Sequence, residues 1–178
     1  VALNTIPGSG SILDARNDGV GDTAADVLGN TVDLDANGGG IGASAGANDL
    51  AIDSFRGAGC TRSDDGITIT ATCDVGLEAD DSIYLTETAG PMHLVLAHAV
   101  DDVRLTVRET VATDEDLYLL RSGSALFFED APDQPRTVAH GQVYAETGFV
   151  LLRVGDDVTI DPNAKLYAGT DIDLYGDM

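Results

Sequence analysis

The chain reads DDSIYLTE at residues 80–87 and DDVRLTVRE at residues 101–109. In each stretch, two aspartates precede a run in which apolar and polar side chains alternate. Such alternation places one set of side chains on each face of a half-buried β-strand. Similar short runs, bounded by Asp and Gly, recur along most of the chain. The sequence therefore predicts an all-β fold.

The spacing of these runs indicates the architecture. One core residue from each run gives separations of 18, 17, 16, 20, 14, 26, 15 and 14 residues, at Val32, Leu50, Ile67, Ile83, Val103, Leu117, Val143, Val158 and Ile172. A unit of this length is too short for a β–α–β crossover and fits one coil of a solenoid. The sequence predicts a parallel β-helix, or β-solenoid, of short coils. An antiparallel β-sandwich is the alternative, because two strands in each unit would give the same spacing.

The expected strands begin at Thr31, Asp49, Gly66, Ser82, Asp102, Asp116, Ala125, Gln142, Phe149, Asp157 and Asp171. Two weak helical patterns cover residues 22–28 and 91–100. No Pro- or Ser-rich linker divides the chain. We therefore expect residues 1–178 to form a single β-solenoid segment, which belongs to a longer repeat array because the end coils of a solenoid expose sheet edges.

The charge of the chain excludes several classes of partner. Asp and Glu number 31 against 9 Lys and Arg, a net charge of -22. Phosphate backbones and anionic lipids repel such a chain, so we expect neither nucleic-acid binding nor docking on a membrane surface. No apolar run approaches the ~18 residues of a membrane span. Membrane insertion is therefore not expected.

Residues 14–26, DARNDGVGDTAAD, are similar to a calcium-binding loop of the EF-hand type. The predicted calcium ligands are the carboxylates of Asp14, Asp18 and Asp22 and the backbone carbonyl of Val20. Arg16 stands where a ligand is wanted, and Ala25 stands where the EF-hand has its bidentate Glu. A calcium site and an ordinary Asp/Gly-rich turn both remain open interpretations. Calcium is the one cofactor that the sequence suggests.

The acidic doublets suggest a second arrangement. If Asp65, Asp81 and Asp102 stack at one corner of successive coils, their carboxylates lie about one strand spacing, ~4.8 Å, apart. An exposed ladder of this kind tolerates the repulsion in salt, whereas a partly buried ladder needs a divalent cation. The solvated corner and the cation-binding corner are both open.

Arg104 and Arg108 point to the same face of their predicted strand, because they are separated by an even number of residues. Asp101, Asp102 and Glu109 lie beside them in the sequence. We expect the arginines to neutralise these carboxylates. The alternative is a catalytic cluster for polysaccharide cleavage, since acid–base hydrolysis and elimination use carboxylates and basic groups in one groove.

Cys60 and Cys73 are the two cysteines of the chain. They enclose a loop of a size that a single disulfide closes, and such bonds persist in oxidising compartments. We expect a Cys60–Cys73 disulfide. No sequence pattern typical of a zinc site surrounds either residue.

Four stretches also resemble a known family: GSILDA at residues 10–15, NTVDL at 30–34, GGGIG at 38–42 and DSIYLTE at 81–87. They are similar to the repeat units of very large bacterial surface proteins of the filamentous-haemagglutinin and repetitive-adhesin kind. The resemblance implies a right-handed β-helix, a secreted or cell-surface location, and a structural or adhesive role in a stalk or filament.

Two further expectations, on partners and on activity, accompany this interpretation. The partners would be neighbouring repeats or identical chains, stacked end to end or edge to edge, with a glycan or a cell-surface ligand as a further partner. The chain would not be an enzyme. The alternative is a polysaccharide lyase or hydrolase, because parallel β-helices also carry such enzymes.

Overall fold

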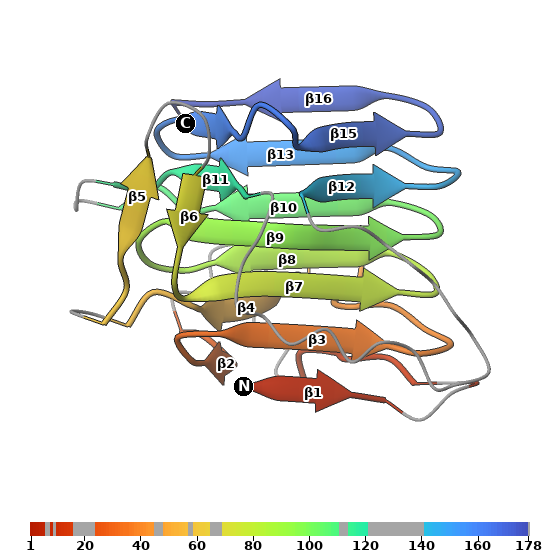
Figure 1. Cartoon of the computed structure of the whole chain (residues 1–178). Coiled ribbons are helices and arrows are strands. Elements are labelled where there is room, and N and C mark those ends of the chain that lie inside the picture. Colours follow the sequence, from red (N-terminus) through yellow and green to blue (C-terminus); the bar gives the residue numbers. More distant parts are fainter. Residues whose placement is uncertain are drawn as a thin grey trace.

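The computed structural model of the chain describes residues 1–5, 8, 10–15, 24–44, 48–56, 59–64, 69–110, 114–120 and 141–177. These residues form two large sheets in which neighbouring strands run parallel, and one small antiparallel pair (Figure 1). The described residues contain no helix. The predicted all-β class is therefore confirmed for this part of the chain, and the antiparallel sandwich is wrong for the two large sheets.

The first large sheet has eight strands. They are β1 (Ala2–Asn4), β3 (Val32–Ala36), β7 (Asp74–Ala79), β9 (Met92–Ala99), β11 (Leu117–Leu119), β12 (Gln142–Ala145), β14 (Val158–Ile160) and β15 (Lys165–Ala168). The order is β1-β3-β7-β9-β11-β14, and β12 pairs with both β9 and β15. The long strand β9 thus supports two shorter strands side by side.

The second large sheet has six strands in the order β16-β13-β10-β8-β4-β2. They are β2 (Val27–Leu28), β4 (Leu50–Asp53), β8 (Ile83–Glu87), β10 (Val103–Val107), β13 (Val150–Val154) and β16 (Ile172–Tyr175). In Figure 1 the strands of the two sheets point in opposite directions, and the chain passes from one sheet to the other as it rises. We call one passage through both sheets a circuit.

Alternation in the sequence decides which side chains enter the core. In β10, Val103, Leu105 and Val107 are buried, whereas Arg104 and Thr106 are only partly buried. Parallel register then stacks equivalent residues of neighbouring strands into columns. One column of the six-stranded sheet is entirely leucine, at positions 50, 85, 105, 152 and 174. The core between the sheets is built from such columns.

The circuits are less regular than the spacing of the sequence suggests. Ile83 pairs with Val103, so the 20 residues between them make one full circuit. Val32 and Leu50, however, lie in different sheets and are half a circuit apart. The expectation that each interval is one coil is therefore wrong, because full and half circuits have similar lengths in this chain.

Both predicted helices are replaced by strands where the structure describes them. Residues 92–99 form β9, and residues 27 and 28 form β2. The pattern of β9 misleads because all eight of its side chains are buried, so the polar–apolar alternation of a strand is missing. The strand expected at Ala125 lies outside the described residues.

A hairpin interrupts the series of parallel strands. It consists of β5 (Arg62–Asp64) and β6 (Ile69–Ala71), and it stands across the outer face of the eight-stranded sheet in Figure 1. The strand predicted from Gly66 thus belongs to this hairpin and to neither large sheet. Arg62 lies over the ring of Tyr118, at 4.0 Å from its centre, and Ala71 packs against Val95 and Leu120. The hairpin therefore covers the outer side of β9 and β11.

Candidate functional site: the open ends of the sheets

The core columns remain open at the C-terminal end of the described fold. Val150 and Leu152 of β13 are 0% and 1% exposed, whereas their partners in β16, Ile172 and Leu174, are 44% and 49% exposed. These are the same inward-facing columns, so the difference arises because no described strand lies beyond β16. Two large apolar side chains of the core columns are thus left uncovered at this end.

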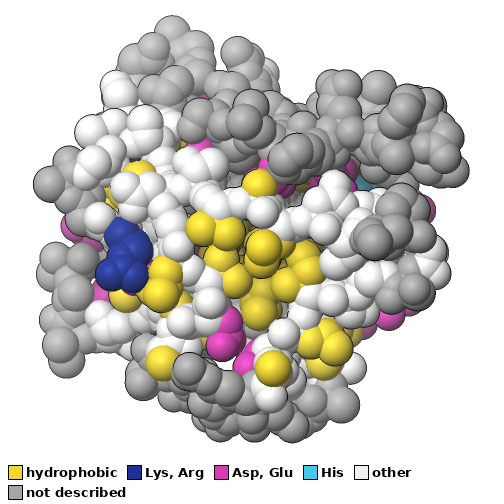
Figure 2. All heavy atoms as spheres, turned by 90° about the horizontal axis from the view of Figure 1, so that it is seen from below, with side chains coloured by type: hydrophobic (Ala, Val, Ile, Leu, Met, Phe, Trp, Pro, Cys, Tyr) yellow, Lys and Arg dark blue, Asp and Glu magenta, His cyan; other side chains and the backbone are white. Residues whose placement is uncertain are grey.

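The opposite end is open in the same way. Leu3 of β1 continues the column of Leu34 and Leu77, yet it is 40% exposed while both of these are fully buried. In the other sheet, Val27 of the edge strand β2 continues the column of Ile52 and is 8% exposed, whereas Leu28 points away from the core and is exposed. Figure 2, which views the molecule from below, shows hydrophobic side chains gathered near the middle of this face.

The strands at these ends also have one free edge each. Among the described strands, β16 pairs only with β13, β1 only with β3, and β2 only with β4. A free edge presents backbone N–H and C=O groups that another strand can pair with. Each end therefore combines an apolar column with unpaired backbone groups, the two features that a further strand of the same kind would satisfy.

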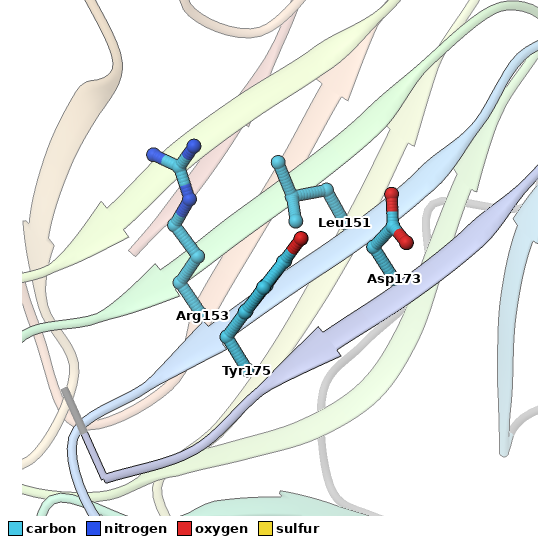
Figure 3. A pocket seen from close by; sticks show the side chains of 4 residues that line it. All are labelled: Leu151, Arg153, Asp173 and Tyr175. Carbon is cyan, nitrogen blue, oxygen red and sulfur yellow. The ribbon is translucent and has the colours of Figure 1, made fainter.

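An open hollow of about 390 Å³ lies beside the C-terminal end. Leu151 and Arg153 of β13 and Asp173 and Tyr175 of β16 line it. Figure 3 shows these four side chains on one side of the sheet, the face opposite to the core columns. Arg153 and Tyr175 are register partners, as are Leu151 and Asp173. The hollow thus offers the guanidinium group of Arg153, the carboxylate of Asp173 and the aromatic ring of Tyr175.

Arg104 has a different partner from the ones that the sequence suggested. Its guanidinium bonds the carboxylate of Asp49 and lies over the ring of Tyr84, 4.4 Å from the ring centre. Tyr84 lies in β8, between β10, which carries Arg104, and β4, which Asp49 directly precedes. The ion pair therefore spans two neighbouring strand pairings. Among the described residues, the expected neutralisation of Asp101 and Asp102 by Arg104 is replaced by this longer-range pair. Arg108 donates its backbone N–H to the carbonyl of Glu87, 3.1 Å away.

The prediction that Asp81 and Asp102 stack at one corner is wrong by one residue. The backbone N–H of Asp101 donates to the carbonyl of Asp81 at 3.0 Å, so these two residues stack at the corner. Asp102 aligns with Ser82 instead, and its carboxylate accepts hydrogen bonds from the Tyr84 hydroxyl at 2.9 Å and the Phe149 N–H at 3.1 Å. The cause is that Ser82 separates Asp81 from its strand, whereas Asp102 directly precedes Val103. Asp65 lies outside the described residues.

The calcium loop proposed from the sequence falls largely outside the described residues. Asp14 is described and buried, and its carbonyl accepts a hydrogen bond from the side-chain amide of Asn48 at 3.3 Å. Asp18, Val20 and Asp22 lie in the part that is not described. The calcium loop therefore stays a prediction.

The two cysteines are joined in the structure by a disulfide, with their Cα atoms 5.4 Å apart. Cys73 directly precedes β7, and Cys60 lies in the segment that leads into β5. The bond ties the base of the hairpin to the eight-stranded sheet. This places the hairpin over His93, whose Nδ1 lies 2.8 Å from the carbonyl of Thr72.

Several described ionisable residues are buried that the sequence did not mark as such, and Glu87 is one of them. Glu87 ends β8 with its side chain pointing into the core and fully buried, between Ile52 and Val107 of the neighbouring strands. The backbone N–H and the hydroxyl of Ser54 both donate to its carboxylate. Burial, reinforced by the charge of Asp53, raises the pKa of Glu87 to about 8, although the Ser54 hydrogen bonds act against this. Its position two residues after Leu85 was the signal in the sequence that the side chain faces inwards.

Comparisons with protein-family models, with curated proteins and with solved structures give no significant match. Within the described part of the chain, no helix has the length and apolar character required to cross a membrane.

Proposed function

We propose that this protein is a right-handed parallel β-solenoid segment with a structural or adhesive role, extending by addition of further coils at its two ends. The passage of the chain between the two parallel sheets supports the solenoid, with each circuit as one coil. The right hand of the winding is favoured because parallel strands joined by a crossover are connected right-handedly in nearly all proteins. A secreted or cell-surface location is part of this proposal, and the Cys60–Cys73 disulfide supports it.

The uncovered ends of the core columns are the main support for this proposal. A coil of a solenoid buries its apolar face only against its neighbours. Ile172 and Leu174 at one end, and Leu3 at the other, lie in columns whose internal members are fully or almost fully buried. The partner proposed for each end is therefore another coil of the same kind, from a neighbouring repeat or from an identical chain. Because the two ends differ, an identical chain would join head to tail, and such contacts extend into a filament.

The hollow beside Tyr175 supports glycan contact more than glycan cleavage. Its aromatic ring, guanidinium and carboxylate suit hydrogen bonding and stacking with a sugar. Hydrolysis ordinarily requires two carboxylates placed on either side of the bond to be cleaved. Asp173 is the only carboxylate among the residues that line this hollow, so the enzyme alternative gains no support here.

End-to-end association is tested by sedimentation velocity with each end blocked separately. Leu3→Asp blocks one end and Leu174→Asp blocks the other, while Thr106→Asp adds the same charge on the outer face of the central strand β10. We expect the wild type and the Thr106 variant to form oligomers that grow with protein concentration. High salt should promote them, because it screens the repulsion between chains of net charge -22.

The blocked variants distinguish head-to-tail stacking from other contacts. Each alone should be monomeric, and an equimolar mixture should form a dimer, since the mixture contains one intact end of each kind. A wild type that stays monomeric at high concentration and high salt would refute end-to-end stacking. Blocked variants that associate as the wild type does would show that another surface is responsible.

A further inference from the structure

Three carboxylates from three separate segments meet at one corner of the fold. Glu109 follows β10, Glu115 precedes β11 and Asp156 follows β13. One carboxylate oxygen from each of the three lies within 4.8 Å of the others. The backbone holds the corner together, because Gly155 N–H donates to the Val107 carbonyl and Asp156 N–H donates to the Glu115 carbonyl.

Glu115 supplies the observation that points to a ligand. Its side chain is fully buried, yet the oxygen Oε2 has no hydrogen-bond partner among the described residues. The other oxygen, Oε1, accepts a hydrogen bond from the Thr110 hydroxyl. A buried carboxylate normally has its oxygens satisfied by donors or by a cation. Among the described residues, the Glu109 and Asp156 carboxylates lie next to it, and these are acceptors that cannot satisfy it when ionised.

Charge at the corner leads to the same conclusion. Three carboxylates gather here, and the Asp156 carboxylate also accepts a hydrogen bond from the Glu115 backbone N–H at 3.2 Å. The corner is therefore a concentration of negative charge, with the buried Glu115 on one side and the exposed Glu109 and Asp156 on the other. A cation from solution has direct access through the exposed side.

The oxygen spacing lies within the reach of one calcium ion. Calcium binds oxygens at about 2.3–2.6 Å, so ligands on opposite sides of the ion lie up to about 5 Å apart. Magnesium binds at about 2.0–2.1 Å and requires near-ideal octahedral geometry, whereas calcium accepts six to eight oxygens in flexible geometry. The carboxylate oxygens of this corner lie within 4.8 Å of one another and come from three separate segments, which suits the more flexible shell of calcium. The exposed side leaves room for water molecules to complete the shell.

We propose that Glu109, Glu115 and Asp156 form a calcium site that ties neighbouring circuits of the fold together. The ion would join the segments that follow β10 and β13 to the one that precedes β11. This site differs from the loop at residues 14–26 and does not depend on the proposed stacking of the ends.

A side chain at position 155 would crowd the proposed ligands. A Cβ at this position would lie 2.8 Å from Oε2 of Glu109 and 3.0 Å from both the Glu109 backbone and the Glu115 side chain. A larger residue here would therefore require Glu109 and Glu115, two of the three proposed ligands, to shift.

Isothermal titration of Ca²⁺ into chelator-treated protein tests the site. We expect saturable binding with a Kd of about 10⁻⁴ to 10⁻³ M, as in extracellular calcium modules, and weaker binding of Mg²⁺. Glu115→Gln should weaken the titrated site at least ~10-fold, because it removes the buried charge and keeps the shape of the side chain. Asp171→Asn, which removes an exposed carboxylate elsewhere, should leave binding unchanged.

Two further variants keep the test decisive. If Glu115→Gln does not fold, the exposed Glu109→Gln replaces it and should weaken binding in the same way. Asp18→Asn alters the residue 14–26 loop and should leave this binding intact. Absence of saturable Ca²⁺ binding in the wild type would overturn the proposal. So would binding that Asp18→Asn abolishes and the corner variants do not affect. Either result leaves the sedimentation test of the ends untouched.

Discussion

Replacing Glu87 with glutamine should make the protein more stable at neutral and alkaline pH. Burial raises the pKa of Glu87 from its ordinary value of 4.5 to about 8. Below pH 4.5 the carboxyl is protonated in both the folded and the unfolded chain, so its contribution to stability is fully present. Between pH 4.5 and 8 the unfolded chain loses the proton first, and the folded state loses stability as pH rises.

The size of the effect follows from the two pKa values. Their difference of about 3.5 corresponds to at most ~5 kcal/mol, at about 1.36 kcal/mol for each unit of pKa. We expect a measured gain of about 2 to 4 kcal/mol for Glu87→Gln at pH 8.5, because the effective dielectric around a buried group exceeds that of a dry interior. Glutamine keeps an oxygen that accepts the Ser54 N–H and a shape close to that of glutamate.

Urea unfolding followed by circular dichroism at several pH values measures this gain. The free energy of unfolding of Glu87→Gln should match that of the wild type within about 1 kcal/mol at pH 4.5 and exceed it increasingly up to pH 8. Asp33, whose pKa burial and the nearby Asp35 raise to about 6, affects both proteins equally and cancels in the comparison. Asp171→Asn controls for the loss of one negative charge. A Glu87→Gln difference that does not change with pH would refute the assignment of Glu87 as a buried acid.

Two further predictions concern the disulfide and the core columns. Replacing both Cys60 and Cys73 with serine should lower the free energy of unfolding by about 3 kcal/mol. Reducing agent should reproduce this loss in the wild type, and unchanged stability in both experiments would contradict a role for the bond. Leu152→Ala, in the closed part of the leucine column, should cost about 2–5 kcal/mol, whereas Leu174→Ala at the open end should cost under ~1 kcal/mol in dilute monomer. Equal losses of unfolding free energy for the two variants in dilute solution would mean that Leu174 is already covered there, which would contradict an open end.

Much of the strand content could be predicted from the sequence, because alternation is a local property of the chain. The residues of β8 and β10 show which side chains face the core without any knowledge of their neighbours. The disulfide was also predictable, since Cys60 and Cys73 are the only cysteines. Strand β9 was not predictable in this way, because the hairpin and the second sheet bury both of its faces and remove the alternation.

The register of the strands and the meeting of distant residues were decided by the tertiary structure alone. Whether Asp81 stacks on Asp101 or on Asp102 depends on how the turns align columns of buried side chains, and one residue in a turn changes the answer. Glu115 and Asp156 are 41 residues apart, and neither has a sequence pattern typical of a cation site. They meet because the parallel pairing of β11 with β14 brings their turns together. The alternation of inward and outward side chains depends only on the residues of each strand. The number of residues in a circuit depends instead on how one layer of strands packs on the next.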